Sequence, residues 1–306
     1  AASGSNEGVA KKAAAELGAR WFPQASDAIS REKVEAVYLA TTPKEHPEAV
    51  KLASENNLDI LCDKPIATNL ADADTVLKLA EKAGVRLMLP FNPRYQLGTQ
   101  KLKEMIDAGE LGELRIIHIV KCGKVPLAIK SMDLRWFLDT QVAGFGGFGD
   151  IGIHALDALR WLTGREALSV YAQIHNGASP DLPIDSIGTA IIEIEGETLA
   201  TLTSGWINPP GFPSFLDTRF EVVGTQKTGV VEKAYREMKV FDDNGAEFIP
   251  VSRPDIDCLV DAFVHSVMEE KEPPITGKDG RAALELTLAA YRSAKTGEVV
   301  SLPLKE

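Results

Sequence analysis

Short apolar runs alternate with helical segments over the first third of the chain, and this alternation limits the possible folds more than any other feature. The apolar runs at residues 34–40, 58–62 and 85–89 have the length and composition of strands. Helical patterns occupy residues 46–55 and 70–83 between them, and Thr68 can cap the second helix. Strands joined by helices of this length predict βαβ units in a parallel sheet.

The pattern changes near residue 112, where a strand candidate at residues 113–122 follows a predicted helix. Further strand candidates then come in close succession, at residues 168–174, 186–194, 198–205, 218–223, 229–232 and 238–241. Short connections between strands favour an antiparallel sheet. The prediction is therefore an α/β protein: a dinucleotide-binding part with a Rossmann-type parallel sheet over residues 1–92, and an α+β domain with an open, mainly antiparallel sheet over residues 93–306. The last predicted helix can pack back on the first part.

Composition excludes several classes of protein. The net charge of −11, with scattered Lys and Arg, argues against a nucleic-acid partner. Cys62, Cys122 and Cys258 are widely spaced, which fits a reducing cytoplasm better than a disulfide scaffold, and no Cys/His cluster indicates a metal site. No apolar run is long enough to span a membrane. We expect a cytoplasmic protein with no nucleic-acid, membrane or metal partner.

Three turns follow the strands of the predicted parallel sheet, at the edge where such sheets bind ligands. They are Thr41-Thr42-Pro43, Asp63-Lys64-Pro65 and Asn92-Pro93-Arg94. At this edge Lys64 can donate to a substrate oxygen or transfer a proton, although it can also be a surface lysine paired with Asp63. Arg94 can meet an anion, or be a surface arginine. His46 can lie near a cofactor phosphate, or simply begin an exposed helix.

A glycine-rich segment, residues 144–149, precedes a helix that we expect to begin near Asp150. Glycine allows backbone to approach a ligand closely. Asp150, His154 and Asp157 share one helix face, so Asp150 can orient the His154 imidazole; a capping Asp and a solvated His are the alternative. The same three residues are also a candidate metal-ligand set for hydrolysis, which no second acid/His cluster supports. Arg135 and Trp136 can line a pocket, although packing is the usual role of a Trp.

In this order, the motifs resemble the glucose–fructose oxidoreductase / inositol dehydrogenase (Gfo/Idh/MocA) family of NAD(P)-dependent oxidoreductases. The resemblance extends over essentially the whole chain. It rests on residues 40–43 with His46, 63–65 with Ala67, 91–95, 109–112, 144–157 and 293–297.

The resemblance implies a catalytic group of Lys64, Asp150 and His154, in a motif where Asp63 replaces the glutamate usual in the family. It implies cofactor contacts from Ser3, Thr41, Thr42, Pro43, His46, Asp63, Lys64, Asn92 and Arg94. We expect the substrate to be bound by Lys64, Arg135, Trp136, Asp150 and His154.

The start of the chain departs from the family, which opens with a strand, a GxGxxG loop, a helix and a second strand. Residues 1–5 resemble the end of that second strand, so we expect a sheet that lacks its central strand and a chain that binds cofactor weakly. NAD-preferring folds usually place an acid where this chain has Ser3. The cofactor is therefore predicted to be NAD or NADP, with a preference for NADP.

The resemblance implies a dehydrogenase that transfers a hydride between NAD(P) and a CH–OH group of a sugar, a polyol or a related compound. His154 would act as general base with Asp150 orienting it, and Lys64 would polarise the same oxygen; His154 and Lys64 can exchange these roles. The alternative is a non-catalytic regulatory protein that senses a dinucleotide or a sugar, against which the complete Lys/Asp/His set argues. The open sheet face predicts a homodimer or homotetramer.

Overall fold

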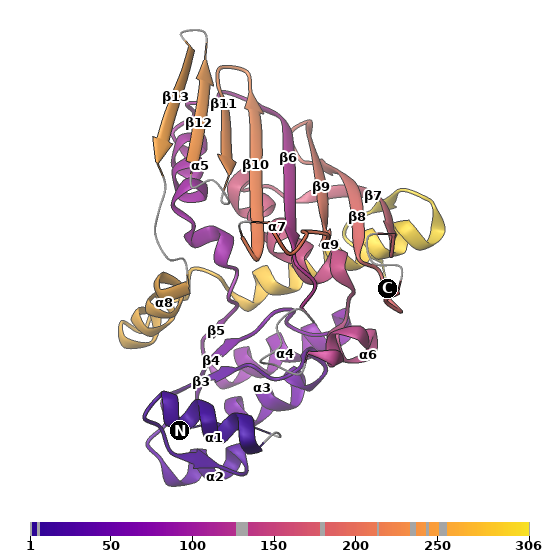
Figure 1. The fold of residues 1–306 in the computed structure, drawn as a ribbon. Helices are drawn as coiled ribbons and strands as arrows, with labels where there is room; N and C mark the ends of the chain where they lie inside the picture. The colour runs from indigo at the N-terminus through magenta and orange to yellow at the C-terminus, as the bar shows by residue number, and fades with distance from the viewer. Residues whose placement is uncertain are drawn as a thin grey trace.

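A computed structural model describes residues 2–4, 7–126, 134–177, 181–212, 214–232, 237–242, 245–250 and 256–305. Ala1 and Ser5, which the sequence places in the first strand region, lie outside the described residues. Two connected parts are visible in Figure 1: short strands and helices at the bottom, and a large sheet at the top.

The N-terminal part consists of short strands that alternate with helices. Its elements are β1 (Ala2–Ser3), α1 (Glu7–Glu16), β2 (Trp21–Phe22), α2 (Ala25–Arg31), β3 (Ala36–Leu39), α3 (His46–Glu55), β4 (Asp59–Cys62), α4 (Leu70–Ala83) and β5 (Leu87–Met88). Within the described residues β1 pairs with β2, and β3, β4 and β5 pair in that order, with every pair parallel. The predicted parallel, Rossmann-type arrangement is confirmed.

Two local details differ from the sequence prediction. The pattern does not indicate β2 or α2, because a strand of two residues is too short to show a period. Thr68 does not cap α4; Asn69 does, and its side-chain oxygen accepts a hydrogen bond from the Asp72 N–H at 2.9 Å. Asn and Thr both accept such a bond, so the sequence alone could not decide between adjacent caps.

The second part is built on a large sheet. Its strands are β6 (Leu114–Gly123), β7 (Ala167–His175), β8 (Ile187–Ile194), β9 (Thr198–Trp206), β10 (Leu216–Gly224), β11 (Thr228–Glu232), β12 (Glu237–Asp242), β13 (Gly245–Pro250) and β14 (Val300–Ser301). In the described chain they are ordered β13-β12-β11-β10-β6-β9-β8-β7-β14, and only β6 and β9 pair in parallel. The mainly antiparallel sheet is confirmed, although the sequence pattern does not indicate β13 or β14.

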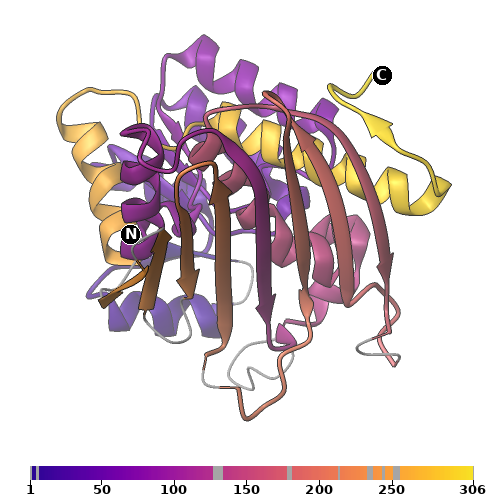
Figure 2. The ribbon, with the colours of Figure 1, turned by 90° about the horizontal axis from the view of Figure 1, so that it is seen from above.

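Helices cover one face of this sheet and leave the other face open (Figure 2). The helices of this part are α5 (Leu97–Asp107), α6 (Thr140–Ala143), α7 (Gly147–Thr163), α8 (Ile256–Met268) and α9 (Gly277–Thr296). Alternate residues of β6, such as Ile117 and Ile119, are buried in a core that also contains Leu156 and Leu159 of α7. The period of two along the strands therefore separates a helix-covered face from an open one.

α7 lies between two hydrophobic cores. Leu156 and Leu159 belong to the core under the large sheet, whereas Ile153 belongs to the core of the N-terminal part. α9 also reaches both parts, since it packs against α4 and against β7. These two helices place residues of the large domain beside the carboxyl ends of the parallel strands. Among the described residues, no helix has both the length and the apolar character needed to cross a bilayer.

Candidate active site

Lys64 and Asp150 form an ion pair between the two parts of the chain. Lys64 follows β4, with a cis peptide bond to Pro65, and Asp150 lies in the first turn of α7. The Lys64 Nζ donates to Asp150 Oδ1 at 2.5 Å and to the Asp150 backbone oxygen at 2.8 Å. The two side chains are 17% and 15% exposed. Lys64 is therefore not the surface lysine paired with Asp63, whose Oδ1 instead accepts the Lys64 backbone N–H at 2.8 Å.

The second carboxylate oxygen of Asp150 also has a protein partner. The buried Trp206, at the end of β9, donates its Nε1–H to Asp150 Oδ2 at 3.0 Å. The Asp150 carboxylate thus contacts Lys64 and Trp206, and its orientation of the His154 ring stays a prediction. An ammonium group is a strong partner for a carboxylate, and Lys64 comes from a segment that local spacing cannot reveal.

His154 lies one turn after Asp150 on the same face of α7 and packs against the N-terminal part. Its ring contacts Phe91 edge to face, with 5.7 Å between the ring centroids. Phe91 is fully buried and follows β5. The structure therefore brings the three predicted catalytic residues to the junction of the two parts, with Lys64 and Asp150 in direct contact and His154 about one helical turn, ~5.4 Å, further along the axis.

The glycine-rich segment approaches protein atoms closely. A Cβ atom on Gly146 would lie 2.2 Å from Asp185 Oδ1, and one on Gly149 would lie 2.5 Å from Phe145 Cγ. The close approach that the sequence assigns to a ligand is therefore explained by internal packing at these two positions.

His46 is fully buried and connects two of the predicted ligand-binding turns. Its Nδ1 lies 2.9 Å from the Pro65 oxygen, and its Nε2 lies 3.2 Å from the Thr41 oxygen. Burial lowers the pKa of His46, while the hydrogen bond to Pro65 and the charge of Asp63 oppose that shift. The ring thus connects the turns after β3 and β4. This role differs from both sequence-based interpretations of His46, a contact with a cofactor phosphate and an exposed residue at the start of a helix.

The remaining predicted cofactor residues lie after the parallel strands. Thr41 is exposed and Pro43 is buried, and the Thr42 hydroxyl and N–H both contact the Glu45 carboxylate, at 2.8 and 3.1 Å. Ser3 is exposed at the end of β1. Asn92 begins a short 3-10 helix, η2 (Asn92–Tyr95), after β5. Thr41 and Ser3 offer exposed hydroxyl groups at the ends of parallel strands, and such donors fit a dinucleotide.

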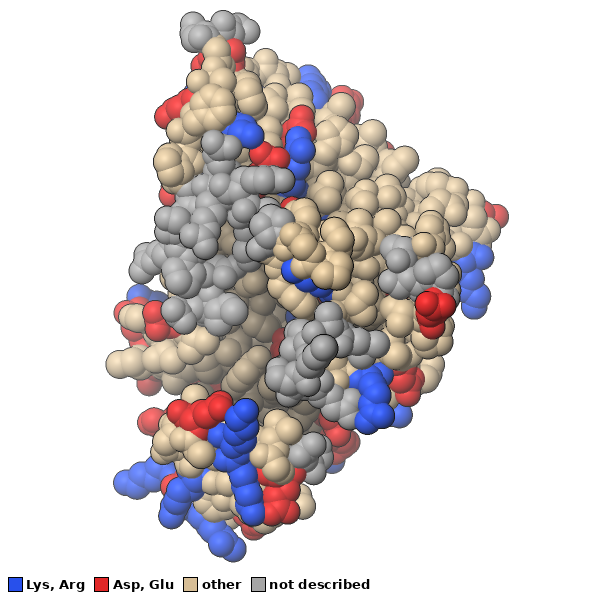
Figure 3. All heavy atoms as spheres, viewed as in Figure 1, with Lys and Arg blue, Asp and Glu red and all other residues tan. Residues whose placement is uncertain are grey.

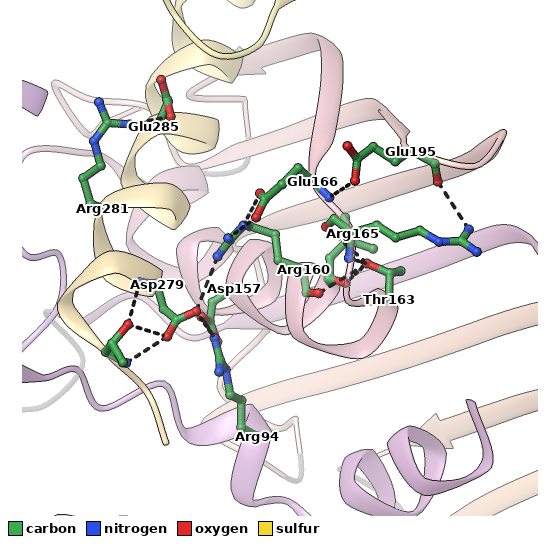
Figure 4. Close-up of polar contacts among 12 residues, drawn as sticks. Arg94, Asp157, Arg160, Thr163, Arg165, Glu166, Glu195, Asp279, Arg281 and Glu285 are labelled. Carbon is green, nitrogen blue, oxygen red and sulfur yellow. Dashed lines mark hydrogen bonds and ion pairs between the residues drawn. The ribbon is translucent and has the colours of Figure 1, made fainter. Parts of the chain in front are cut away.

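Arg94 has a structural role that its sequence position does not reveal. Its Nε and Nη2 donate to the two oxygens of Asp157, at 2.8 and 2.5 Å, and Nη2 also lies 3.1 Å from Asp279. Figure 4 shows this group, in which Arg160 joins from α7 and Asp279 from α9. Because the guanidinium is engaged inside the protein, we leave Arg94 out of the proposed cofactor contacts.

Asp157 is likewise removed from the candidate metal set. It is fully buried, and burial raises the pKa of its carboxyl to about 6 while Arg94 acts against that shift. Its oxygens point to Arg94, whereas Asp150 contacts Lys64. Within the described chain, no group of three or more His, Cys, Asp or Glu side chains could hold a metal ion.

Aromatic side chains connect the predicted pocket residue Trp136 with Asp150. Arg135 and Trp136 begin η4 (Arg135–Leu138), and Trp136 stacks on Phe137 with 4.0 Å between centroids. Phe137 in turn meets Trp206 edge to face at 6.2 Å, and Trp206 binds Asp150. Sequence reasoning missed Phe137 and Trp206, because the position of Trp206 depends on the pairing of β9 with β6.

Two family matches extend over most of the chain. Residues 1–91 match the oxidoreductase family with an NAD-binding Rossmann fold, and residues 99–229 match the GFO/IDH/MocA C-terminal domain. The chain belongs to the GFO/IDH/MocA oxidoreductase family. The resemblance drawn from the motifs is thereby confirmed, together with the assignment to NAD(P)-dependent oxidoreductases.

Several members of the GFO/IDH/MocA family are similar over nearly the full length of this chain. Myo-inositol dehydrogenase Hyg17 of Streptomyces leeuwenhoekii is 29% identical over 271 residues, which cover 84% of this chain and 78% of that protein. D-xylose 1-dehydrogenase (NADP(+)) of Haloarcula marismortui is 23% identical over 292 residues, 92% and 78% of the two chains. The structure of the WlbA dehydrogenase of Bordetella pertussis, solved with NADH and UDP-GlcNAcA, has a TM-score of 0.83 at 24% identity. The match covers 99% of this chain and 90% of that chain. These relatives are named as enzymes, which gives no support to the regulatory alternative.

Proposed function

We propose that this family member interconverts a CH–OH group and a carbonyl group in a sugar, a polyol or a related compound, with NAD(P) as hydride carrier. The observation that carries the proposal is the Lys64–Asp150 ion pair at the carboxyl edge of the parallel strands, one helical turn from His154. The named activities of the relatives, on myo-inositol and D-xylose, support this substrate class.

In the oxidation direction, the carbon that bears the hydroxyl loses a hydride and the oxygen loses a proton. Lys64, whose ammonium is held by Asp150, donates a hydrogen bond to that oxygen and stabilises developing negative charge. His154 takes the proton. Trp206 fixes the far oxygen of Asp150, so the orientation of the carboxylate is set from two sides. Arg135 and Trp136 complete the proposed substrate contacts.

The nicotinamide cofactor supplies or accepts the hydride when it is bound. The chain's contribution is a set of turns at the strand ends, from Ser3, Thr41, Thr42, Pro43, Asp63, Lys64 and Asn92. His46 stabilises this set because its ring contacts the backbone oxygens of Thr41 and Pro65, in two of the turns.

Of the two dinucleotides, we propose that NADP binds more tightly. Ser3 is exposed at the end of β1, where an acid would repel a 2′-phosphate, and a small hydroxyl does not. Titration with NADPH and NADH, followed by nicotinamide fluorescence, tests this directly. Tighter binding of NADPH is the expected result, and tighter binding of NADH would overturn the assignment.

The open sheet face supports a proposed homodimer or homotetramer. Ile116, Val120, Ile191 and Leu199 are 38%, 40%, 47% and 45% exposed on this face. Apolar patches of this kind mark protein interfaces.

The division of the chain at residue 92 stays a prediction. Cys62, Cys122 and Cys258 all lie within the described residues and form no disulfide there, which supports the proposed reducing compartment.

The experiment that tests the proposed function is a steady-state assay of the protein over a panel of sugars and polyols with both cofactors. We expect turnover with at least one member of the panel and its loss in His154→Ala. Full turnover by His154→Ala would remove that residue from the mechanism. Tight dinucleotide binding without turnover on any compound would instead favour the regulatory alternative.

A further inference from the structure

Asp150 lies in the first turn of α7. The backbone N–H groups of this turn have no partners within the helix and need acceptors from other segments of the chain. A helix leaves its first N–H groups without intrahelical partners, and a capping side chain usually accepts one of them. The residue before α7 is Gly146, which has no side chain and so cannot cap the helix itself. The acceptors for this helix therefore have to come from other segments.

Asp185 and Tyr291 supply these acceptors. The N–H of Gly147 donates to the Asp185 backbone oxygen at 2.8 Å, and the N–H of Phe148 donates to Asp185 Oδ2 at 2.9 Å. The N–H groups of Gly149 and Gly146 both donate to the Tyr291 hydroxyl, at 3.1 and 3.2 Å. The helical ladder then begins with the Asp150 N–H, which donates to the Gly146 oxygen at 2.9 Å.

The two acceptor residues are also bonded to each other. The Tyr291 hydroxyl donates to the Asp185 carboxylate, at 3.0 Å to Oδ1 and 3.1 Å to Oδ2. Burial, reinforced by the Asp185 charge, raises the pKa of Tyr291 well above its usual value. The hydroxyl therefore keeps its proton and can donate to Asp185 while it accepts from the two glycine N–H groups.

Packing holds the same segment in place. Tyr291 stacks on Phe145 with 5.5 Å between centroids, and Phe148 meets it edge to face at 5.9 Å. A Cβ atom on Gly149 would lie 2.9 Å from Tyr291 Cε2, and one on Gly146 would collide with Asp185. The chain at the start of α7 therefore has little room to move.

From these contacts we infer that Asp185 and Tyr291 form a clamp that positions the catalytic groups of α7. Asp150 directly follows the clamped segment, and His154 comes one turn later, so any displacement of this turn moves both relative to Lys64. The residues come from the connection before β8 and from α9, which also packs on the N-terminal part. They are positioning residues, and the inference rests on the proposed function, in which Asp150 and His154 act on the substrate.

Tyr291→Phe tests the clamp, because it removes one oxygen and keeps the ring that stacks on Phe145. We expect kcat to fall roughly 10- to 100-fold, as reactant misplacement by about 1 Å can do, while the KM values for cofactor and substrate stay within about twofold of wild type. Asp185→Asn should act in the same direction. The matched control is Tyr171→Phe, which removes a hydroxyl on β7 that accepts a hydrogen bond from the Gln173 side-chain amide at 2.7 Å, and it should leave kcat unchanged.

Hydrogen exchange of peptides that cover residues 145–151 provides a readout that requires no substrate. Faster exchange in Tyr291→Phe than in wild type and Tyr171→Phe is expected from the loss of an acceptor for two N–H groups. Unchanged exchange together with wild-type kcat would overturn the clamp. A lower melting temperature with wild-type kcat would overturn it too, because the residue would then be structural only. If the proposed function failed, wild type itself would show no turnover, whereas the exchange result would still report on the clamp.

Discussion

Lys64 and Asp150 form a partly buried ion pair, which we expect to contribute more to the proposed reaction than to the stability of the fold. Burying two charges costs several kcal/mol, and the attraction between them repays this cost only when the geometry is good. Here the carboxylate has a second donor in Trp206, and the ammonium has a second acceptor in the Asp150 backbone oxygen. This arrangement fixes a cation where a substrate oxygen would bind, which is the property that the proposed reaction needs.

Replacement of Lys64 by Met tests that role and retains most of the apolar stem. We expect kcat to fall by about 10²- to 10⁴-fold, the range typical of a lost proton-transfer or hydrogen-bonding group in a reaction centre. Initial rates with the substrate found in the panel measure this change. Lys227→Met is the matched control, because it breaks an ion pair with Glu110 at 3.0 Å on the surface, and it should retain wild-type kcat. Wild-type kcat in Lys64→Met would contradict the role of the ammonium.

The buried ring of His46 makes a prediction about stability and pH. Burial lowers the pKa of His46 in the folded state below the usual value of about 6.5. As the pH falls through about 6.5, this histidine is therefore protonated in the unfolded chain before it is protonated in the folded protein. The free energy of unfolding is then expected to decrease as the pH falls through this range, and to be unaffected by this residue at higher pH. The slope from this one group is at most about 1.4 kcal/mol per pH unit.

His46→Gln should flatten this part of the pH dependence. The free energy of unfolding, measured with denaturant from about pH 5 to about pH 8, should vary less steeply in the variant than in wild type. His265→Gln, which changes an exposed histidine on α8, is the comparison variant. An identical slope in wild type and His46→Gln would show that the ring does not titrate as its burial implies.

At the scale of elements, residues that are distant in the sequence contact α7 at its first turn and near its middle. Asp185 and Tyr291 bind its first turn, and Arg94 binds Asp157 near its middle. The sequence pattern predicts the helix and the shared face of Asp150, His154 and Asp157. It cannot predict that Asp157 meets an arginine while Asp150 meets a lysine, because both partners lie in another part of the chain.

Arg94→Met should destabilise the fold, because it leaves the Asp157 carboxylate buried without its main partner. We expect the free energy of unfolding to fall by about 3–5 kcal/mol, as measured by denaturant titration. Arg219→Met is the matched control: its side chain is 46% exposed beside Glu221, so the loss should be below about 1 kcal/mol. The double variant Arg94→Met/Asp157→Leu should recover part of the loss. Equal effects of the two arginine changes would contradict the structural role of Arg94.

The sequence is informative about the fold wherever local periodicity is strong. The boundaries of α3 and α4 agree with the predicted ranges, and each predicted strand lies within a few residues of an observed strand. The strands β2, β13 and β14 are absent from the prediction. β2 and β14 have two residues each, which is too few to show a period. Lys64, Asp150 and His154 are identifiable through the motif resemblance, whereas Trp206 and Tyr291 are not, since their roles arise from tertiary contacts.

At the scale of the whole molecule, the open face of the large sheet leads to a prediction about assembly. Leu199→Arg places a charge on that face, where Leu199 is 45% exposed, and should shift the protein toward monomers because a buried unpaired charge disfavours an interface. Light scattering after size-exclusion chromatography measures the mass. Leu17→Arg, in the turn directly after α1, changes a residue that is 77% exposed and should leave the mass unchanged. A wild-type protein that is already monomeric would contradict the proposed interface.

The net negative charge is a second property of the whole molecule. Figure 3 shows Asp and Glu side chains mixed with Lys and Arg over the face in view, with several basic side chains close together at its lower end. The net charge of −11 is the basis for expecting no nucleic-acid partner, and this expectation stays a prediction.

The most direct test of the account is an isotope-transfer measurement. A sugar or polyol that the protein turns over is prepared with deuterium on the carbon that bears the reacting hydroxyl, and the nicotinamide product is analysed by mass spectrometry. Hydride transfer predicts that the deuterium is found on the reduced nicotinamide, with loss of this reaction in Lys64→Met. Turnover that leaves the nicotinamide unlabelled would contradict direct hydride transfer.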